Sequence, residues 1–327
     1  MRLVMMGTGP FAVPTFEALL ESGHEVVALV TRPTPTPKGR EKQSLNPMRD
    51  VAVARQIAVH APESINTPES VALLTSLAAD LLVVCDYGQI LKPAALAAAR
   101  LGGINLHGSL LPKYRGSAPV HWSILAGDAT TGVSVIHMTP RLDGGPILAV
   151  RETPIGPEET MPELELRLST MGVAAVLEAI DLLEQWDGTS PIGVPQDATL
   201  VTKAPRFARG DGELDYRKSA VLLARQVRAF KPWPGSYTHW LREGQQPLRL
   251  IIDRATAEPA ETASAAPPGT VVDVAHGKLT VMTADGLLLV TSLQPAGKRV
   301  LSAAEFLNGY GLKVGAQLGP APVVEKP

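Results

Sequence analysis

The chain has 327 residues, of which 45% are hydrophobic and 19% are charged. This composition is typical of a folded globular protein and excludes an intrinsically disordered chain, while the length favours two domains. No segment has the ~18 apolar residues of a membrane span, and the first residues are too briefly apolar for a secretory signal. We therefore expect a cytoplasmic protein without membrane contact. The single cysteine, Cys85, excludes an intrachain disulfide and a zinc site built from cysteines.

The two parts of the chain differ in charge, although the total is only −2. Residues 1–205 hold 15 Lys and Arg against 21 Asp and Glu, whereas residues 206–327 hold 15 against 11. The excess of four positive charges makes the second part the candidate surface for a polyanion. A solvated surface without a partner explains this modest excess about as well.

The first part of the chain alternates between short apolar runs and helical segments. Strands are predicted over residues 2–6, 24–31, 57–60, 80–85 and 103–107, and helices over residues 10–21, 48–59, 68–76 and 93–100. Strands that alternate with helices indicate an α/β fold, here a Rossmann-like, mostly parallel sheet with helices on both faces. Residues 131–138 and 145–154 are expected to add later strands, and residues 163–186 to form one long amphipathic helix.

The second part of the chain has the pattern of a small β domain. After a helix predicted over residues 219–230, five short strand-like runs with turn signals predict an OB-like β-barrel. These runs lie at residues 236–241, 248–255, 269–274, 278–282 and 287–293, and the insert at residues 257–268 is expected to be a loop. The predicted domains are residues 1–188, a linker at 189–207, the barrel at 208–316 and a flexible tail at 317–327.

Residues 7–12, Gly-Thr-Gly-Pro-Phe-Ala, follow a predicted strand and open a helix, which is the pattern of a nicotinamide-binding turn. Such sites hold the ribose with an acidic residue at the end of the second strand. That position falls at residues 30–32, Val-Thr-Arg, which include no Asp or Glu. Since an arginine suits a 2′-phosphate, an NADP-dependent reductase stays an alternative. The other interpretation is a tight turn whose free amides line a cleft.

Two polar side chains stand near the end of the strand predicted over residues 103–107. Asn105 and His107 are two positions apart and therefore share one face, at the carboxyl end of the strand where open α/β sheets bind ligands. An amide donor beside an imidazole can stabilise an oxyanion, and the imidazole can also move protons. From the spacing alone, a histidine and an asparagine satisfied within a core are the simpler interpretation of this pattern.

The wider segment resembles a known family. The sequence Asn-Leu-His-Gly-Ser-Leu-Leu-Pro-Lys-Tyr-Arg-Gly at residues 105–116, followed by Leu-Asp-Gly-Gly at residues 142–145, resembles the signature of the formyltransferases that use 10-formyltetrahydrofolate. The resemblance runs over nearly the whole chain. It implies transfer of a formyl group from this co-substrate to an amine, a reaction that requires no metal and no covalent enzyme intermediate.

The resemblance also implies which residues catalyse the reaction. Asn105 would donate to the oxyanion, His107 would donate a second hydrogen bond or shuttle a proton, and Asp143 would orient His107 and fix its tautomer. The sequence Asp-Gly-Gly on its own is typical of a hairpin turn. Only the resemblance therefore favours Asp143 over Asp80 or Asp86 as the carboxylate.

Two segments resemble the folate-binding parts of the family, namely residues 109–112 and residues 84–91. The residues expected to contact the co-substrate are Ser109, Leu110, Leu111, Pro112, Tyr87, Gly88, Gln89 and Ile90. Apolar side chains would cover the faces of the pterin while backbone groups read its edge. Cys85 and Asp86 depart from the family, which has small apolar residues there, so the details of the pterin contacts stay open.

Within the family, the chain is most similar to the members that formylate methionyl-tRNA, which implies initiator methionyl-tRNA as its partner. Residues 200–205 and 293–299 resemble segments of those members. The basic loop at residues 34–43 corresponds to a loop that reaches the acceptor end of tRNA in them, although a solvated surface loop is the simpler interpretation of its residues. The expected tRNA contacts are Lys38, Arg40, Lys42 and Lys203, and we expect the protein to act as a monomer.

Two further alternatives remain at the level of sequence. A formyltransferase acting on the amine of a sugar nucleotide shares the Asn-x-His pattern and a similar loop. A nucleic-acid-binding module with a degenerate catalytic domain would also be basic in its second part. All three catalytic positions are filled, however, which argues against the degenerate module.

Overall fold

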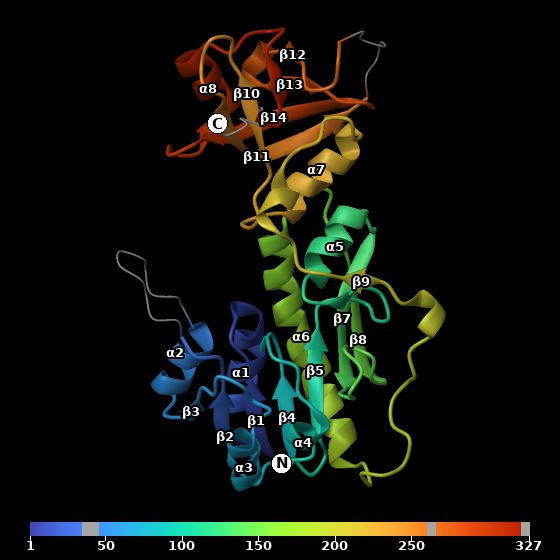
Figure 1. Cartoon of the computed structure of the whole chain (residues 1–327). Helices are drawn as coiled ribbons and strands as arrows, with labels where there is room; N and C mark the ends of the chain where they lie inside the picture. Colours follow the sequence, from blue (N-terminus) through green and yellow to red (C-terminus); the bar gives the residue numbers. More distant parts are fainter. Residues whose placement is uncertain (35–45, 260–265, 322–327) are drawn as a thin grey trace. The chain divides into compact units, whose positions relative to one another are not determined.

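The computed structural model describes residues 1–34, 46–259 and 266–321, and the chain divides into two compact units. The first unit comprises Met1–Val120, Ala129–Ile155 and Glu163–Pro205. The second comprises His121–Asp128, Gly156–Pro162 and the residues from Arg206 onward. Figure 1 labels most of the helices and strands of both units.

The first unit is built on a mixed, mostly parallel sheet with the strand order β3-β2-β1-β4-β5-β7-β8. Its strands are β1 (Arg2–Met6), β2 (Glu25–Val30), β3 (Ala58–His60), β4 (Leu81–Val84), β5 (Gly103–His107), β7 (Thr130–His137) and β8 (Ile147–Pro154). The first five strands pair in parallel, whereas β7 runs antiparallel to β5 and to β8. The predicted fold class is thereby confirmed, with β5 and β7 as the junction between the two pairing modes.

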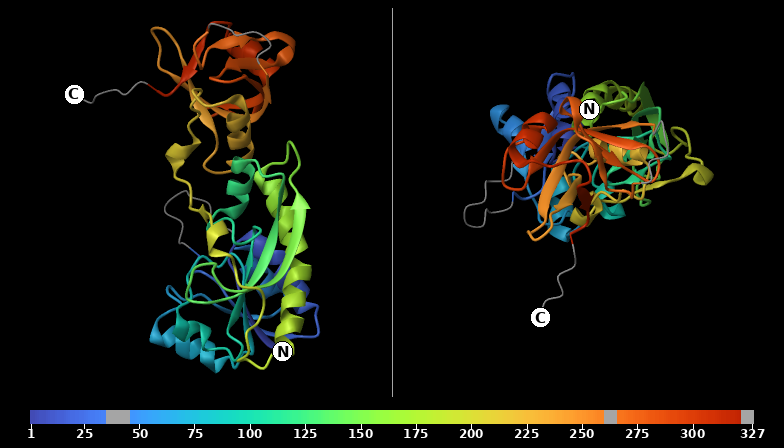
Figure 2. Two further views of the ribbon diagram at one scale, coloured as in Figure 1. Left: turned by 90° about the vertical axis from the view of Figure 1, so that its right-hand side faces the viewer. Right: turned by 90° about the horizontal axis from the view of Figure 1, so that it is seen from above.

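Helices cover both faces of this sheet. They are α1 (Val13–Leu20), preceded by a 3-10 turn at Pro10–Ala12, α2 (Pro47–Ala54), α3 (Pro68–Ser76), α4 (Pro93–Leu96) and α6 (Met161–Glu184). The two views of Figure 2 show α3 and α6 on opposite faces. On the α3 face, Leu74 and Leu96 pack with Leu82 and Val84 of β4. On the other face, Leu106 of β5 lies so close to Gly172 of α6 that a Cβ there would stand 2.6 Å from it.

Local sequence explains where these helices begin. Each of the helices α1 to α4 has a proline in its first turn, where no intrahelical partner for the missing N–H is needed. The side chains of Asn46 and Thr67 cap α2 and α3 by accepting hydrogen bonds from the backbone N–H groups of Arg49 and Ser70.

The second unit contains an antiparallel barrel with the strand order β12-β13-β14-β11-β10-β16, with β15 paired to β14. Its strands are β10 (Tyr237–Leu241), β11 (Leu248–Glu258), β12 (Val271–Asp273), β13 (Leu279–Met282), β14 (Leu287–Pro295), β15 (Leu301–Ser302) and β16 (Gln317–Gly319). A bridge between Thr270 and Gln317 joins the two ends of the sheet, so the barrel is nearly closed. Its core packs around Leu250, Val290 and Phe306, together with the helices α7 (Ala220–Ala229) and α8 (Ala303–Tyr310).

The structure corrects the sequence-based elements at several places. Strand β11 continues to Glu258, where it pairs with Leu287, so the expected loop begins later than residue 257; residues 260–265 lie outside the described part. Strand β16 pairs with β10, so the barrel extends to Gly319 rather than ending at residue 316. The structure also contains α8, β15, β16 and the helix α5 (Pro119–Ala126), none of which was predicted.

The segment interpreted as a linker has a definite structure over its second half. Strand β9 (Lys203–Ala204) pairs in parallel with β6 (Arg115–Gly116), and residues up to Pro205 belong to the first unit. Prolines and glycines interrupt the periodicity here because the segment follows loops of the first unit instead of forming a regular element. In the described part of the chain, no helix is long and apolar enough to cross a membrane.

Candidate active site

Asn105 and His107 lie side by side on β5, as their spacing predicts. In the register of the sheet, Asn105 is opposite Ile136 and His107 is opposite Ser134 of β7. His107 is buried, with 5% of its surface exposed, whereas Asn105 is half-buried. Among the described residues, the Asn105 side chain has no hydrogen-bond partner, so its amide hydrogens are available to a bound molecule.

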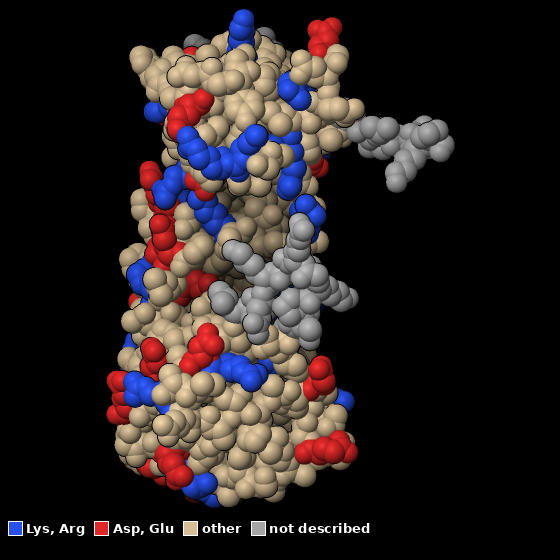
Figure 3. Space-filling model, turned by 90° about the vertical axis from the view of Figure 1, so that its left-hand side faces the viewer, with Lys and Arg blue, Asp and Glu red and all other residues tan. Residues whose placement is uncertain are grey.

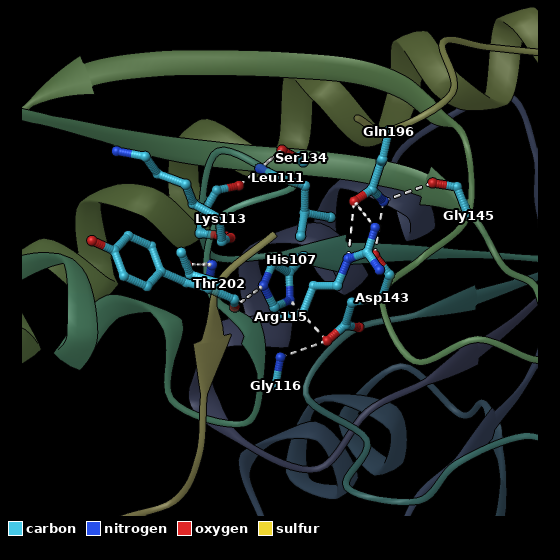
Figure 4. A network of polar contacts seen from close by, with 12 residues as sticks. His107, Leu111, Lys113, Arg115, Gly116, Ser134, Asp143, Gly145, Gln196 and Thr202 are labelled. Atoms are coloured by element: carbon cyan, nitrogen blue, oxygen red, sulfur yellow. Dashed lines mark hydrogen bonds and ion pairs between the residues drawn. The ribbon is translucent and has the colours of Figure 1, made fainter. Parts of the chain in front are cut away.

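The two ring nitrogens of His107 face different groups. Nε2 lies 2.9 Å from the backbone carbonyl oxygen of Tyr114, and because a carbonyl only accepts hydrogen bonds, Nε2 must carry a hydrogen. Nδ1 lies 3.9 Å from Oδ2 of Asp143, a separation that forms an ion pair only when the ring is protonated. Figure 4 shows His107 beside Asp143. Tyr114 therefore fixes the tautomer of the neutral ring, and Nδ1 is the nitrogen left for chemistry.

Asp143 stands in the connection between β7 and β8, in a left-handed backbone conformation with φ of +48°. Its Oδ2 accepts a hydrogen bond of 2.8 Å from the backbone N–H of Gly116. Gly145 is required by a close approach, because a Cβ there would stand 1.8 Å from the carbonyl oxygen of His137. The Asp-Gly-Gly sequence is thus a hairpin connection that also brings a carboxylate to His107.

The two other candidate carboxylates lie elsewhere. Asp80 accepts hydrogen bonds from the backbone N–H of Arg2 and the side chain of Arg100, at the amino end of the sheet. Asp86 follows β4 and is exposed beside Gly9. Of the three carboxylates considered from sequence, only Asp143 forms a contact with His107 among the described residues.

The loop at residues 109–112 is held from within. The Ser109 hydroxyl donates a hydrogen bond of 2.7 Å to the carbonyl of Lys113, and Ser109 has no exposed surface. The Ser134 hydroxyl donates to the Ser109 carbonyl at 2.8 Å and accepts from the Leu111 N–H at 3.0 Å. Leu110 and Pro112 are half-buried and Leu111 is buried. Ser109 therefore shapes the loop, while Leu110 and Pro112 present its surface.

The residues at 87–90 that are expected around a pterin also include both buried and accessible side chains. Tyr87 is buried in the core, which raises the pKa of its hydroxyl to about 12, and that oxygen has no hydrogen-bond partner among the described residues. Gln89 is half-buried and accepts a hydrogen bond of 2.8 Å from the N–H of Ile65. Gly88 and Ile90 are exposed, Ile90 to 63%. Of these four residues, Gly88 and Ile90 are therefore the most accessible.

A second group of titratable side chains lies near the end of β4. Burial raises the pKa of the Cys85 thiol well above its usual range, with smaller contributions from Asp86 and Glu165. Burial, and then the charge of Asp86, raises the pKa of Glu165 on α6 to about 7. Cys85 therefore stays a neutral thiol, in agreement with a role in packing.

Sequence reasoning missed the residues that surround the contacts of His107. The side-chain amide of Gln196 donates to the carbonyls of Asp143 and Gly145, at 2.8 and 2.7 Å. Its Oε1 accepts from Nε and Nη2 of Arg115, at 3.1 and 2.7 Å. Thr202 accepts a hydrogen bond of 2.8 Å from the N–H of Tyr114. The pairing of β6 with β9 brings these residues together. No pattern in the sequence indicates this pairing, which becomes visible only in the folded structure.

The expected tRNA contacts are only partly within the described residues. Lys38, Arg40 and Lys42 lie outside them, whereas Lys203 is exposed on β9. On the face shown in Figure 3, Lys and Arg side chains gather over the upper part of the picture, which is the C-terminal unit. The described residues include no cluster of His, Cys, Asp and Glu that could hold a metal ion.

Comparisons with known proteins agree with the sequence resemblance. A family described as formyl transferase matches residues 1–180, and the formyl transferase C-terminal domain matches residues 206–311. The methionyl-tRNA formyltransferase of Rhodopirellula baltica is 49% identical over 326 residues, covering 97% of this chain and 96% of that protein. The corresponding protein of Paramagnetospirillum magneticum is 39% identical over 320 residues, covering 98% and 100%.

Solved structures share the fold at low sequence identity. WlaRD, a sugar 3N-formyl transferase crystallised with dTDP and 5-N-formyl-THF, matches with a TM-score of 0.62 and 17% identity, over 91% of this chain and 99% of that one. A variant of HypX from Aquifex aeolicus matches with a TM-score of 0.61 and 18% identity, over 94% of this chain but only 48% of HypX. At such identities the likeness concerns the fold alone.

Proposed function

The chain belongs to the formyl transferase family, and from this premise we propose that it transfers the formyl group of 10-formyltetrahydrofolate to the α-amine of initiator methionyl-tRNA. The observation that carries the proposal is the match with methionyl-tRNA formyltransferases that are 39 and 49% identical and extend over both units. The product is N-formylmethionyl-tRNA, which serves translation initiation.

10-Formyltetrahydrofolate supplies a formyl carbon for attack by the amine, so negative charge develops on the formyl oxygen and the folate nitrogen departs with a proton. The half-buried amide of Asn105, which has no partner among the described residues, fits this oxygen as a hydrogen-bond donor. A hydrogen-bond donor to an oxygen that becomes negatively charged in the transition state lowers the activation barrier by roughly 3 kcal/mol. Asn105 thus acts mainly on the reaction rate rather than on substrate affinity.

His107 handles the proton at Nδ1. The Nε2 hydrogen is donated to the Tyr114 carbonyl. Only Nδ1 can therefore take a proton from the attacking amine or return one to the departing nitrogen. The amine loses one proton and the folate nitrogen gains one, so the ring ends the reaction in its starting state. When Nδ1 is protonated, the Asp143 carboxylate at 3.9 Å stabilises the imidazolium.

Binding of the co-substrate is assigned to the two segments near this site. We propose that Leu110, Pro112, Gly88 and Ile90 contact the pterin directly because they are at least partly accessible. Tyr87, Ser109 and Leu111, which were also expected to contact it, are buried and instead hold those segments in place. Gln89 is half-buried, but its side chain is engaged with Ile65, so we assign it to the same supporting role. The exposed Ile90 gives one face of a flat heterocycle an apolar surface.

The tRNA is assigned to the basic residues. We propose that Arg40, Lys38 and Lys42 contact its acceptor end, that Lys203 contacts a phosphate, and that a single chain acts in the cytoplasm. The exposure of Lys203 and the positive excess of residues 206–327 support this assignment.

The alternatives have less support. The structural likeness to a sugar formyltransferase is at 17% identity, far below that of the tRNA enzymes, and therefore does not favour a sugar nucleotide as acceptor. An NADP-dependent reductase rests only on the turn at Gly7 and Gly9, where the matching families are formyl transferases.

One experiment separates these functions. The purified chain is incubated with 10-formyltetrahydrofolate and either methionyl-tRNA or an amino-sugar nucleotide, and the formylated product is measured. A separate reaction follows the absorbance of NADPH. We expect rapid formylation of methionyl-tRNA alone. Faster formylation of the amino sugar, or oxidation of NADPH, would replace the proposed function by the corresponding alternative.

A further inference from the structure

We propose that the segment from Gln196 to Ala204 positions His107 for reaction by holding both groups that contact its imidazole ring. This inference rests on the proposed function, because it assigns His107 to the proton transfers. It gives a role to a part of the chain that the sequence indicated only as a linker.

The first of the two groups is the Tyr114 carbonyl. Tyr114 has a left-handed backbone with φ of +63°, a conformation that costs free energy for a residue with a bulky side chain. Its N–H donates to Thr202 Oγ1 at 2.8 Å, and the N–H of Arg115 donates to the Thr202 carbonyl at 2.9 Å. Two consecutive peptide units are thus fixed by one residue, so the Tyr114 carbonyl is directed at Nε2 of His107.

The second group is the Asp143 carboxylate, which is also in a left-handed conformation. Gln196 donates both hydrogens of its amide to the carbonyls of Asp143 and Gly145, and its oxygen accepts from the Arg115 guanidinium. The orientation of the amide is unambiguous, since a guanidinium only donates and carbonyls only accept. Gln196 therefore holds the loop that carries Asp143 through backbone carbonyls. The Asp143 carboxylate remains directed at His107 and Gly116.

Arg115 connects the two groups. It follows Tyr114 in the chain, it pairs with Lys203 in the β6 and β9 ladder, and its guanidinium is held by Gln196. Figure 4 shows Arg115, Gln196 and Asp143 together beside His107. A displacement of this network would move the hydrogen-bond acceptor at Nε2 and the carboxylate at Nδ1 together.

The segment has little other reason to be ordered. Leu200 is 58% exposed, Thr202 and Lys203 are exposed as well, and the small side chain of Ala204 is buried. Burial of apolar side chains therefore contributes little to its placement. Apart from the turn that Asp197 forms with Thr199, the polar side-chain contacts of Gln196 and Thr202 are with the loops around His107. Because a misplacement of about 1 Å can reduce a rate by about 10²-fold, this placement bears on catalysis.

The test uses the full-length protein with Gln196→Ala and Gln196→Glu, and with Asp197→Ala as the matched control. Asp197 accepts hydrogen bonds from Thr199 within the same segment but contacts neither loop. We expect Gln196→Ala to lower kcat about 10-fold to 10²-fold with little change in KM for either substrate. We expect Gln196→Glu to be worse, because a carboxylate would face two carbonyls, and we expect Asp197→Ala to retain nearly full kcat.

A double-substitution cycle separates positioning from a general loss of structure. If Gln196 acts through His107, then Gln196→Ala should lower the rate of a His107→Ala protein by less than 2-fold. Multiplicative losses, or a Gln196→Ala protein with full kcat, would overturn the proposal.

A second measurement does not depend on the reaction. The ¹⁵N resonances of the His107 ring in the free protein should report a hydrogen on Nε2, and Gln196→Ala and Thr202→Val should each shift the resonances or broaden them by exchange. Asp197→Ala should leave them unchanged. If methionyl-tRNA is not the acceptor, the proposed function fails while this shift is still observed. An unchanged His107 spectrum in both variants would overturn the positioning role whatever the acceptor.

Discussion

The carboxylate of Asp86 occupies the place where a side chain at position 9 would begin, since a Cβ on Gly9 would stand 1.8 Å from Asp86 Oδ2. Gly9 itself has φ of −91° and ψ of 174°, a backbone conformation open to any residue. A larger residue at position 9 would therefore displace the Asp86 carboxylate, whereas the backbone of Gly9 sets no requirement for glycine.

This relationship predicts a coupled effect of two substitutions. Gly9→Ala should destabilise the protein by about 1 kcal/mol because Asp86 must move. The same change in an Asp86→Ala protein should cost nearly nothing, so the cycle should show a coupling of about the same size. The free energy of unfolding from urea titration measures each value. Equal costs in the two backgrounds would show that the close approach has no energetic consequence.

Asp86 also affects Glu165. Burial, and then the charge of Asp86, raises the pKa of Glu165 to about 7. A carboxyl whose pKa is higher in the folded than in the unfolded chain stabilises the fold at low pH, below about 4.5, and this contribution is lost as the pH rises through about 7. We expect Glu165→Gln to remove roughly 1 to 2 kcal/mol of pH dependence between these limits, after solvent screening is considered.

The measurement for Glu165 is thermal unfolding at pH 5 and pH 8. Relative to the natural chain, Glu165→Gln should have a higher melting temperature at pH 8 and little difference at pH 5. The control is Asp181→Asn, an exposed carboxyl on the same helix. A constant difference across this pH range would mean that Glu165 titrates as an ordinary exposed carboxyl.

The regular elements of the first unit were predictable because local signals agree with the fold. The helix at residues 68–76 was predicted with its observed bounds, since Thr67 caps it and Pro68 begins it. The strand at residues 103–107 was likewise predicted with its observed bounds. Helix α8 was missed although Ser302 and Glu305 form a capping box, a signal that was present in the sequence. Strands β9 and β16, of two and three residues, stand outside the apolar runs that indicate strands, so they were not predicted.

At the candidate site, the contacts that the sequence predicts are clearly separate from those that it does not predict. The period of two along a strand places Asn105 and His107 on one face, so their proximity follows from sequence. The partner of Nε2 is a backbone carbonyl, that of Tyr114, which no side-chain pattern indicates. Gln196 is 53 residues from Asp143 in the chain, and Thr202 is 88 from Tyr114. Such contacts depend on how the chain returns to the sheet, and a single sequence does not specify that path.

The catalytic assignment predicts that Asn105→Ala and His107→Ala each lower kcat by about 10²-fold or more while the protein stays folded. Asp143→Asn should also be slow, because it retains the shape of the side chain but loses the charge near Nδ1. Single-turnover formylation with saturating co-substrate measures the chemical step. Near-normal turnover of the Asn105 or His107 variant would remove that residue from the mechanism.

The basic second part of the chain predicts a salt effect on tRNA binding. Each phosphate contact contributes about 0.7 to 0.9 to the slope of log affinity against log salt. Replacing the exposed Lys278, Lys298 and Lys313 by Gln should therefore flatten the slope, by one contact or more, whereas Lys92→Gln in the first unit should not. Binding isotherms at several salt concentrations measure the slope. An identical slope in the triple variant and the natural chain would contradict phosphate binding by these lysines.

The last prediction concerns Arg40, which lies outside the described residues. A guanidinium binds phosphate with two parallel hydrogen bonds or stacks on a base, whereas an ammonium acts as a point charge. We therefore expect Arg40→Ala to reduce formylation of methionyl-tRNA strongly, and Arg40→Lys to recover only part of it. Because the expected partner is the RNA, melting temperature and tetrahydrofolate binding should change little in either variant. Full formylation by Arg40→Ala would show that this loop does not contact the acceptor end of the tRNA.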